Sequence, residues 1–455
     1  MGTSTYDAAD VSGVTELTGA TGATEITDEI AATRRQLRLV VAGSVDDGKS
    51  TLVGRLLHDT KSILADTYDA IEAASRRRGS EQVDLALLTD GLRSEREQGI
   101  TIDVAYRYFT TPRRSFVLAD TPGHTQYTRN TVTGASTADA ALVLVDVRNG
   151  VLAQTRRHLA VMALLGMPHV VVALNKMDAI GWDQGRFEEV AREVADIATR
   201  LGLGDVRIVP ISALTGEGVV SAEPVGSPDV PRWYAGPPLL TLLEDLDDAA
   251  AEVDRPLRLP VQLVIRPRTA EHPDYRGLAG RIASGRVAVG DEITVTPGGL
   301  TSVVTAIDTP AGPAQVAGAG ESVTVRLRDE LDVGRGSVLS SVASAPRAVQ
   351  QIGGTVCWLD ERPATPGQRV LVKAGTRTTR GILTSVGDHW DVDSLKWVEP
   401  GAPVQLNDIA RVELRLAEPV AVDDYLDDRA TGAFLVIDPA SGATLAAGLV
   451  GPALS

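Results

Sequence analysis

Positions 43–50 read GSVDDGKS, and this stretch decides how the first half of the chain is expected to fold. It matches G-x-x-x-x-G-K-[ST], follows the apolar run Leu37–Ala42 and opens the helical stretch Ser50–Leu57. Glycines in such a strand-to-helix turn let backbone N–H groups converge on phosphate oxygens, and the helix N-terminus adds partial positive charge. The lysine then neutralises β- and γ-phosphate charge, and the serine hydroxyl is a ligand for Mg²⁺. The sequence therefore predicts a nucleotide-phosphate site formed by Gly43, Ser44, Val45, Asp46, Asp47, Gly48, Lys49, Ser50 and Thr51.

Apolar runs of strand length alternate with helical segments after this loop. The expected strands are Phe116–Ala119, Ala141–Val145, Val170–Leu174 and Ile208–Ile211, and the expected helices include Gln154–Leu165 and Arg186–Leu201. This alternation is typical of a mostly parallel sheet with helices on both faces. We predict an α/β phosphate-loop, nucleotide-binding domain over residues 36–248.

The helical period disappears after Arg255. Short β-rich runs separated by Gly and Pro turns continue to the end, such as Glu292–Val295, Arg369–Ala374 and Ala433–Ile437. Two modules of about 90–100 residues each are the size of small barrels. We therefore expect two all-β barrel domains, over residues 255–345 and 347–450.

Composition limits the partners and the compartment. The 455 residues carry a formal net charge of −16, which repels polyanions, so broad binding to DNA or to an anionic membrane is not expected. The single cysteine, Cys357, excludes an internal disulfide framework and fits a reducing cytoplasm. No membrane-spanning run or secretory signal is found. Positions 1–32 hold six acidic residues and no Lys or Arg, so residues 1–35 are predicted to be a disordered acidic tail.

The tetrapeptide NKMD at positions 175–178 follows the expected strand Val170–Leu174. A carboxylate placed there accepts two hydrogen bonds from guanine N1–H and the 2-amino group, whereas adenine offers neither donor. The turn Ser212-Ala213-Leu214 ends the next strand and offers backbone N–H groups to guanine O6. The predicted base-binding residues are Asn175, Lys176, Met177, Asp178, Ser212, Ala213 and Leu214.

Two further segments are predicted to sense the γ-phosphate. The sequence DTPGH at positions 120–124 follows the strand Phe116–Ala119, and it supplies Asp120, Thr121, Pro122, Gly123 and His124. Asp120 is expected to hold Mg²⁺ through water, and His124 to orient the attacking water. Upstream, Thr101 is a second candidate hydroxyl ligand for Mg²⁺. The predicted metal set is Ser50, Thr101 and Asp120, and the predicted catalytic set is Lys49, Thr101 and His124.

Together these motifs resemble the translation-factor-like GTPases from about Gln36 onward. The likeness is greatest to the large GTPase subunits of bacterial sulfate adenylyltransferase, or ATP sulfurylase. It rests on the stretches at 43–52, 93–108, 120–130, 276–286 and 429–438, including Ser44 and Asp47 where elongation factors typically have His. The chain departs from those relatives at Thr125, where they carry an acidic residue, and at Gly216-Glu217-Gly218, where they carry a Gly-Asp-Asn turn.

The resemblance implies a function in sulfate activation. A smaller catalytic subunit would join sulfate to the AMP of ATP, forming adenosine 5′-phosphosulfate and pyrophosphate, while this chain binds and hydrolyses GTP with Mg²⁺. The two would form a heterodimer or larger heteromer in the cytoplasm. Some relatives carry a fused adenylylsulfate kinase, and no second phosphate loop follows Leu201, so that activity is not expected. The alternatives are an elongation-type GTPase that binds aminoacyl-tRNA, disfavoured by the acidic charge, and a GTPase that regulates assembly without coupled chemistry.

Three smaller features receive structural interpretations. The pair Trp233-Tyr234 is expected to pack against the first domain ahead of the helix Leu239–Leu246. The cluster around His389-Trp390 is expected in a solvent-facing loop without a metal. Cys357 is expected to be a buried residue of a strand.

Overall fold

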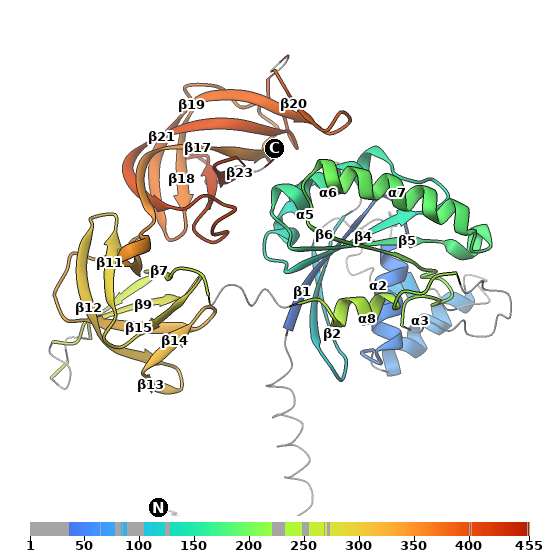
Figure 1. Cartoon of the computed structure of the whole chain (residues 1–455), viewed down its shortest axis with the longest axis horizontal. Coiled ribbons are helices and arrows are strands. Elements are labelled where there is room, and N and C mark those ends of the chain that lie inside the picture. The colour runs from blue at the N-terminus through green and yellow to red at the C-terminus, as the bar shows by residue number, and fades with distance from the viewer. Residues whose placement is uncertain are drawn as a thin grey trace, which may run out of the picture.

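The computed structural model describes most of the chain outside its N-terminal segment. The described residues are 36–63, 65–77, 83, 85–88, 104–122, 128–220, 233–247, 254–267, 269–270, 274–399, 401, 403–452 and 454. Their helices and strands form three groups, which follow one another along the chain (Figure 1). The predicted acidic tail, residues 1–35, lies outside the described part. None of the described helices is long and apolar enough to cross a bilayer.

The first group is a six-stranded sheet of order β2-β3-β1-β4-β5-β6. Its strands are β1 (Gln36–Gly43), β2 (Ala105–Thr110), β3 (Ser115–Asp120), β4 (Ala140–Asp146), β5 (His169–Asn175) and β6 (Asp205–Pro210). All neighbours are parallel except β2, which runs antiparallel to β3 at the edge. The sheet is therefore mostly parallel, as the alternating pattern predicted.

Helices cover both faces of this sheet (Figure 1). They are α2 (Lys49–Asp59), α3 (Ala65–Arg77), α5 (Thr128–Ala135), α6 (Ala153–Leu164), α7 (Gln184–Arg200) and α8 (Leu239–Glu244), with short 3₁₀ turns at Leu85–Leu88 and Met177–Ile180. Alternate β1 residues point to opposite faces: Leu39 packs in the cluster that includes α2 and α8, and Val40 in the cluster that includes α5, α6 and α7. Because both faces are covered, strand β4 is buried at every position.

The second group is a β-barrel domain. Its strands are β7 (Arg258–Pro260), β8 (Leu263–Ile265), β9 (Gly277–Arg281), β10 (Arg286–Ala288), β11 (Glu292–Thr296), β12 (Leu300–Thr309), β13 (Gly312–Ala314), β14 (Val316–Gly318), β15 (Ser322–Leu327) and β16 (Val338–Ser341). The main path runs β7-β16-β11-β12-β15-β9-β8. The Gln262 N–H donates to the Ala279 carbonyl, and Arg258 bridges Ser284, so the first strand meets the segment around β9 and the sheet curls round.

The third group is a closed barrel with an added strand. Its strands are β17 (Arg347–Trp358), β18 (Arg369–Ala374), β19 (Arg377–Asp391), β20 (Lys396–Val398), β21 (Ile409–Val422), β22 (Ala433–Ile437) and β23 (Thr444–Val450). The order is β18-β22-β23-β17-β21-β19-β20, and β18 also pairs with β19. That last pairing closes six strands around an apolar core that includes Trp358.

Side-chain contacts join the third group to the other two. The Tyr425 hydroxyl donates to the Leu165 carbonyl at the end of α6 over 3.0 Å. The Arg258 guanidinium makes a two-pronged contact with Asp423, with N···O distances of 2.8 and 2.9 Å. Because both side chains of this ion pair are largely buried, its desolvation is offset by the two parallel hydrogen bonds, by a bond from Arg258 to the Leu257 carbonyl and by one from the Thr431 hydroxyl to Asp423.

One local prediction was wrong. His389 and Trp390 do not lie in a loop but on the last part of β19, and Trp390 is buried against Trp397. Strand β19 is irregular, since its register against β21 shifts between Leu383 and Ser385 and again between Val386 and His389. These shifts break the alternation of apolar and polar residues that reveals a strand in a sequence. Cys357 lies buried in β17, as expected, and burial raises its pKa to about 12.

Candidate nucleotide-binding site

The predicted phosphate loop joins β1 to α2 as a tight turn. Asp46 and Gly48 have positive φ angles of 65° and 94°. A side chain at Gly48 would collide with the Asn175 amide, so both backbone conformation and space favour glycine there. The Ser44 N–H donates to the Asp47 carboxylate over 2.6 Å, and this bond closes the first part of the turn.

The Lys49 ammonium group is folded back over the loop. Its Nζ donates to the Gly43 carbonyl at 2.7 Å and to the Ser44 carbonyl at 2.9 Å. Burial lowers the pKa of Lys49, against the opposing pull of the Asp120 and Asp47 carboxylates. A buried cation held only by neutral carbonyls and nearby carboxylates is well placed to exchange those carbonyls for phosphate oxygens.

Asn175, at the end of β5, joins the phosphate loop to the turn after β6. Its Nδ2 donates to the Asp47 carbonyl over 2.8 Å, and its Oδ1 accepts from the Ala213 N–H over 2.9 Å. Three segments that are far apart in the sequence therefore meet at one edge of the sheet. Carboxyl ends of parallel strands are where ligands bind in open α/β sheets.

The side chain of the next residue, Lys176, also contacts the phosphate loop at this edge of the sheet. Its backbone has a positive φ of 67°, and its Nζ lies 2.9 Å from the Asp146 carboxylate and also donates to the Asp46 carbonyl. Burial works to raise the pKa of Asp146, but hydrogen bonds from Arg148 and Lys176 outweigh it and hold the pKa at about 2. Asp146 is therefore a carboxylate at any physiological pH.

Asp178 carries a buried acceptor without a partner. Its Oδ1 is inaccessible to solvent and receives no hydrogen bond from the described residues. An unsatisfied buried acceptor costs about 1–3 kcal/mol, so the native structure needs a reason for it. A ligand with N–H donors in one plane, such as a guanine ring, would supply the missing bonds. The buried Ser44 Oγ is likewise without a partner in the described structure.

The turn after β6 offers the other side of this space. Ser212 and Ala213 are buried, and Leu214 is 54% exposed. The Arg55 guanidinium on α2 donates to the Ala213 carbonyl at 3.3 Å and the Leu214 carbonyl at 2.5 Å. Among residues 212–216, the N–H groups of Ser212, Ala213, Thr215 and Gly216 already donate within the described structure, which leaves the Leu214 N–H for an acceptor.

Asp120 lies at the end of β3, where it was expected. It is buried, and its charge acts on Lys49. Thr121 and Pro122 are also buried, and the Thr121 hydroxyl donates to the Val41 carbonyl over 2.7 Å. Thr101, Gly123 and His124 lie outside the described residues, so their predicted roles, like the nucleotide contacts of all the site residues, stay predictions.

Comparisons with known proteins place the chain in a family. Residues 34–252 match the elongation factor Tu GTP binding domain, and residues 351–451 match the GTP-eEF1A C-terminal domain-like family. The chain is 45% identical over 420 residues to sulfate adenylyltransferase subunit 1 of Colwellia psychrerythraea, covering 92% of this chain and 88% of that protein. The chain belongs to the sulfate adenylyltransferase subunit 1 family.

One further relative agrees with this assignment, and one solved structure has a similar fold. The bifunctional enzyme CysN/CysC of Mycobacterium tuberculosis is 49% identical over 415 residues, which cover 91% of this chain and 67% of that protein. The GTPase-like domain of yeast (S. cerevisiae) Ski7, solved with GDP and inorganic phosphate, is 18% identical, with a TM-score of 0.51 over 94% of this chain and 99% of that one. The latter likeness supports the fold alone.

Within this subunit 1 chain, the structure adds a residue that the sequence analysis missed. His158, on α6, is fully buried behind the phosphate loop, where it hydrogen-bonds the Gly43 backbone and lies 3.2 Å from the Gln154 amide nitrogen. Burial, with the nearby Lys49 charge, lowers the pKa of His158 to about 3. The ring is therefore neutral. The only sequence signal for His158 was its position as a polar residue one helical turn after Gln154, on a buried helix face.

The segment Gly216-Glu217-Gly218 lies in a turn closed by side-chain hydrogen bonds. The Glu217 carboxylate accepts from the Trp182 indole at 3.1 Å and the Thr215 hydroxyl at 3.2 Å. The Trp233 indole donates in turn to the Trp182 carbonyl over 3.0 Å and packs against Phe187. Trp233 thus packs against the first domain, as expected.

Proposed function

We propose that this chain is the GTP-hydrolysing subunit of a sulfate adenylyltransferase, acting with a smaller catalytic subunit. That subunit would join sulfate to the AMP of ATP and release pyrophosphate. The proposed reaction is that named for the relatives called sulfate adenylyltransferase subunit 1, and the term subunit in their name implies a partner. The observation that carries the nucleotide half of the proposal is the Asn175 bridge, because it holds the phosphate loop and the predicted base-binding turn around one space.

The choice of guanine rests on Asp178. Its unpartnered Oδ1 needs a donor, and guanine presents two adjacent N–H donors to a carboxylate. Adenine would place its N1 acceptor against this oxygen, leaving both groups unpaired in a buried setting. The N–H groups of Ser212, Ala213, Thr215 and Gly216 already have acceptors, so the Leu214 N–H would donate to guanine O6.

The phosphates would lie on the positive end of α2. Gly43, Gly48 and the loop N–H groups would surround the β-phosphate, and Lys49 would leave its two carbonyl acceptors for the β- and γ-phosphates. Mg²⁺, where bound, neutralises charge between those phosphates, and Ser50, Thr101 and Asp120 are the residues proposed to hold it. His124 is proposed to orient the water that attacks the γ-phosphate.

Hydrolysis on this chain would be coupled to the uphill formation of a phosphate–sulfate anhydride on the partner. Such coupling requires that the GTP and GDP forms have different affinities for the partner's states. The segments that contain Thr101 and His124 are the proposed switches. A cytoplasmic location completes the proposal and fits the single, buried cysteine.

The proposal is tested by reconstitution. The chain should co-purify with a small sulfate adenylyltransferase subunit from the same organism, and the complex should form adenosine 5′-phosphosulfate from ATP and sulfate faster with GTP than with GDP. Binding of aminoacyl-tRNA in a GTP-dependent manner, with no effect on sulfate adenylylation, would instead support an elongation-type function. If the chain binds the small subunit but GTP does not change the rate of sulfate adenylylation, the chain would be a structural subunit only.

A further inference from the structure

Four cations lie together on the outer surface of the third barrel. Strand register places them: Arg369 on β18 lies opposite Ile382 on β19, and Ile382 lies opposite Arg415 on β21. In the adjacent row, Leu371 pairs with Arg380, and the row beyond it contains Lys373. Alternate residues of a strand share a face, so these side chains point outward together. We call Arg369, Lys373, Arg380 and Arg415 the basic face.

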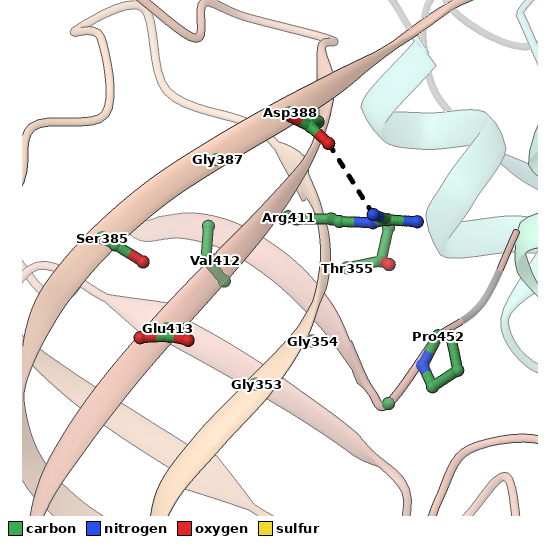
Figure 2. A pocket seen from close by; sticks show the side chains of 11 residues that line it. Gly353, Gly354, Thr355, Ser385, Gly387, Asp388, Arg411, Val412, Glu413 and Pro452 are labelled. Atoms are coloured by element: carbon green, nitrogen blue, oxygen red, sulfur yellow. Dashed lines mark ion pairs between the residues drawn. The ribbon is translucent and has the colours of Figure 1, made fainter. Parts of the chain in front are cut away.

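The cations of the basic face have no ion-pair partners within the described part of the chain, and all four are exposed. The neighbouring cations differ. Arg377 is paired with Glu418 at 2.6 Å, and Arg411 lies 3.7 Å from Asp388 and 4.3 Å from the centre of the Trp397 ring. Figure 2 shows Arg411 directed toward Asp388 above a hollow lined by small residues. The cations of the basic face therefore differ from Arg377 and Arg411 in having no ion-pair partner among the described residues.

This concentration is unusual for the molecule that carries it. The whole chain has a net charge of −16, so four unpaired cations on one barrel surface are a local reversal of sign. Glu413 lies two positions before Arg415 on β21 and also faces outward, so it places a carboxylate at the edge of the basic face. A patch of opposite sign orients an approaching partner and raises its association rate.

The centre of the basic face is aliphatic. Leu371 and Ile382 are half-buried between the four cations. An apolar centre with a charged rim is the usual arrangement of a protein–protein interface. Nucleic-acid surfaces that read single strands use aromatic side chains for stacking, and neither the four cations nor their two neighbours include one. The overall negative charge also opposes a long polyanion.

We propose that the basic face binds an acidic surface of the catalytic subunit whose own centre is aliphatic. This inference rests on the proposed function for the identity of the partner. Beside the face lies the hollow of about 470 Å³ seen in Figure 2, which is lined by Gly353, Gly354 and Gly387. Since glycines leave the backbone uncovered, a partner loop can approach the sheet closely there.

The test compares two double variants with the same change in charge. R380E/R415E reverses two cations of the basic face, and R266E/R286E reverses two exposed cations of the second barrel. Affinity for the tagged catalytic subunit is measured by surface-immobilised binding at low and high salt. GTP affinity and melting temperature verify that each variant is folded.

We expect R380E/R415E to weaken the complex at least about tenfold at low salt and R266E/R286E to change it less than about twofold. The affinity of the parent chain should also fall as salt rises. Equal affinities of both variants and the parent overturn the inference but leave the proposed function intact. No binding by the parent chain overturns the proposed function itself. Loss of RNA binding with subunit binding unchanged would assign the face to a nucleic acid and overturn the inference.

Discussion

Asn175 and Asp47 are 128 residues apart in the sequence and are joined by a 2.8 Å hydrogen bond from the Asn175 amide to the Asp47 carbonyl. The same amide group accepts from Ala213, so one side chain spans three loops at the edge of the sheet. Both backbone partners are in buried surroundings. The bridge therefore determines the distance between the phosphate loop and the proposed base-binding turn.

Replacing Asn175 by Ala should destabilise the domain and the site together. It leaves a buried carbonyl and a buried N–H unpaired, which costs about 1–3 kcal/mol in free energy of unfolding. GTP affinity should fall by about tenfold or more, because the loops lose their spacing. Chemical denaturation and calorimetric titration measure the two effects. Gln184→Ala, an exposed change on α7, is the control. Unchanged GTP affinity in the folded Asn175→Ala protein would show that the bridge is not part of the site.

Asp178→Asn should change the base preference. The Asn amide can donate to the 2-oxygen of xanthine but cannot accept both guanine donors, so preference should move from GTP toward XTP by about a hundredfold or more. Competition binding with GTP, XTP and ATP measures this. Asp183→Asn, at the N-cap of α7, is a matched change of charge outside the site. GTP affinity equal to that of the parent would place the base elsewhere.

His158 predicts a dependence of stability on pH. Its pKa is about 3 in the folded chain and about 6.5 when exposed, so the unfolded chain binds the extra proton between these values. Its contribution is present above pH 6.5 and is lost as the pH falls below it, by about 1.4 kcal/mol per unit. Between pH 6.5 and 5 the parent should lose about 2 kcal/mol more than His158→Gln. Urea unfolding across this range tests the difference, and parallel curves contradict it.

His124→Ala should separate catalysis from binding. If His124 orients the attacking water, its loss lowers the GTP turnover number by about a hundredfold or more while GTP affinity stays within a few-fold. Single-turnover hydrolysis and equilibrium binding of a non-hydrolysable analogue measure the two. His169→Ala, on β5, provides a histidine control outside the predicted switch. Equal losses in turnover and affinity would indicate that His124 maintains the fold instead.

Much of the fold follows from local sequence patterns. The strands β18 and β22 have the predicted bounds, because alternating apolar residues and flanking turns mark a strand that is half-buried. The phosphate loop is equally local, since its glycines and lysine are adjacent in the chain. What a local pattern cannot show is an irregular strand: β19 was not predicted, because its two register shifts move side chains between faces.

The parts of the site that depend on distant contacts could not be predicted in the same way. The sequence marks Asp178 as a base-binding candidate, but only the folded chain shows that its Oδ1 is buried and has no partner among the described residues. His158 looks like an ordinary helix residue until α6 packs behind Gly43. The four cations of the basic face span positions 369–415, and strand register alone gathers them.

The central claim is that GTP hydrolysis on this chain drives sulfate adenylylation on its partner. The most direct measurement follows phosphate released from GTP and adenosine 5′-phosphosulfate formed by the purified complex in the same reaction, with excess ATP and sulfate. The account predicts that the two products rise together and that a non-hydrolysable GTP analogue abolishes the stimulation of sulfate adenylylation. Formation of adenosine 5′-phosphosulfate to the same extent with GTP, with the analogue and with no guanine nucleotide would contradict it.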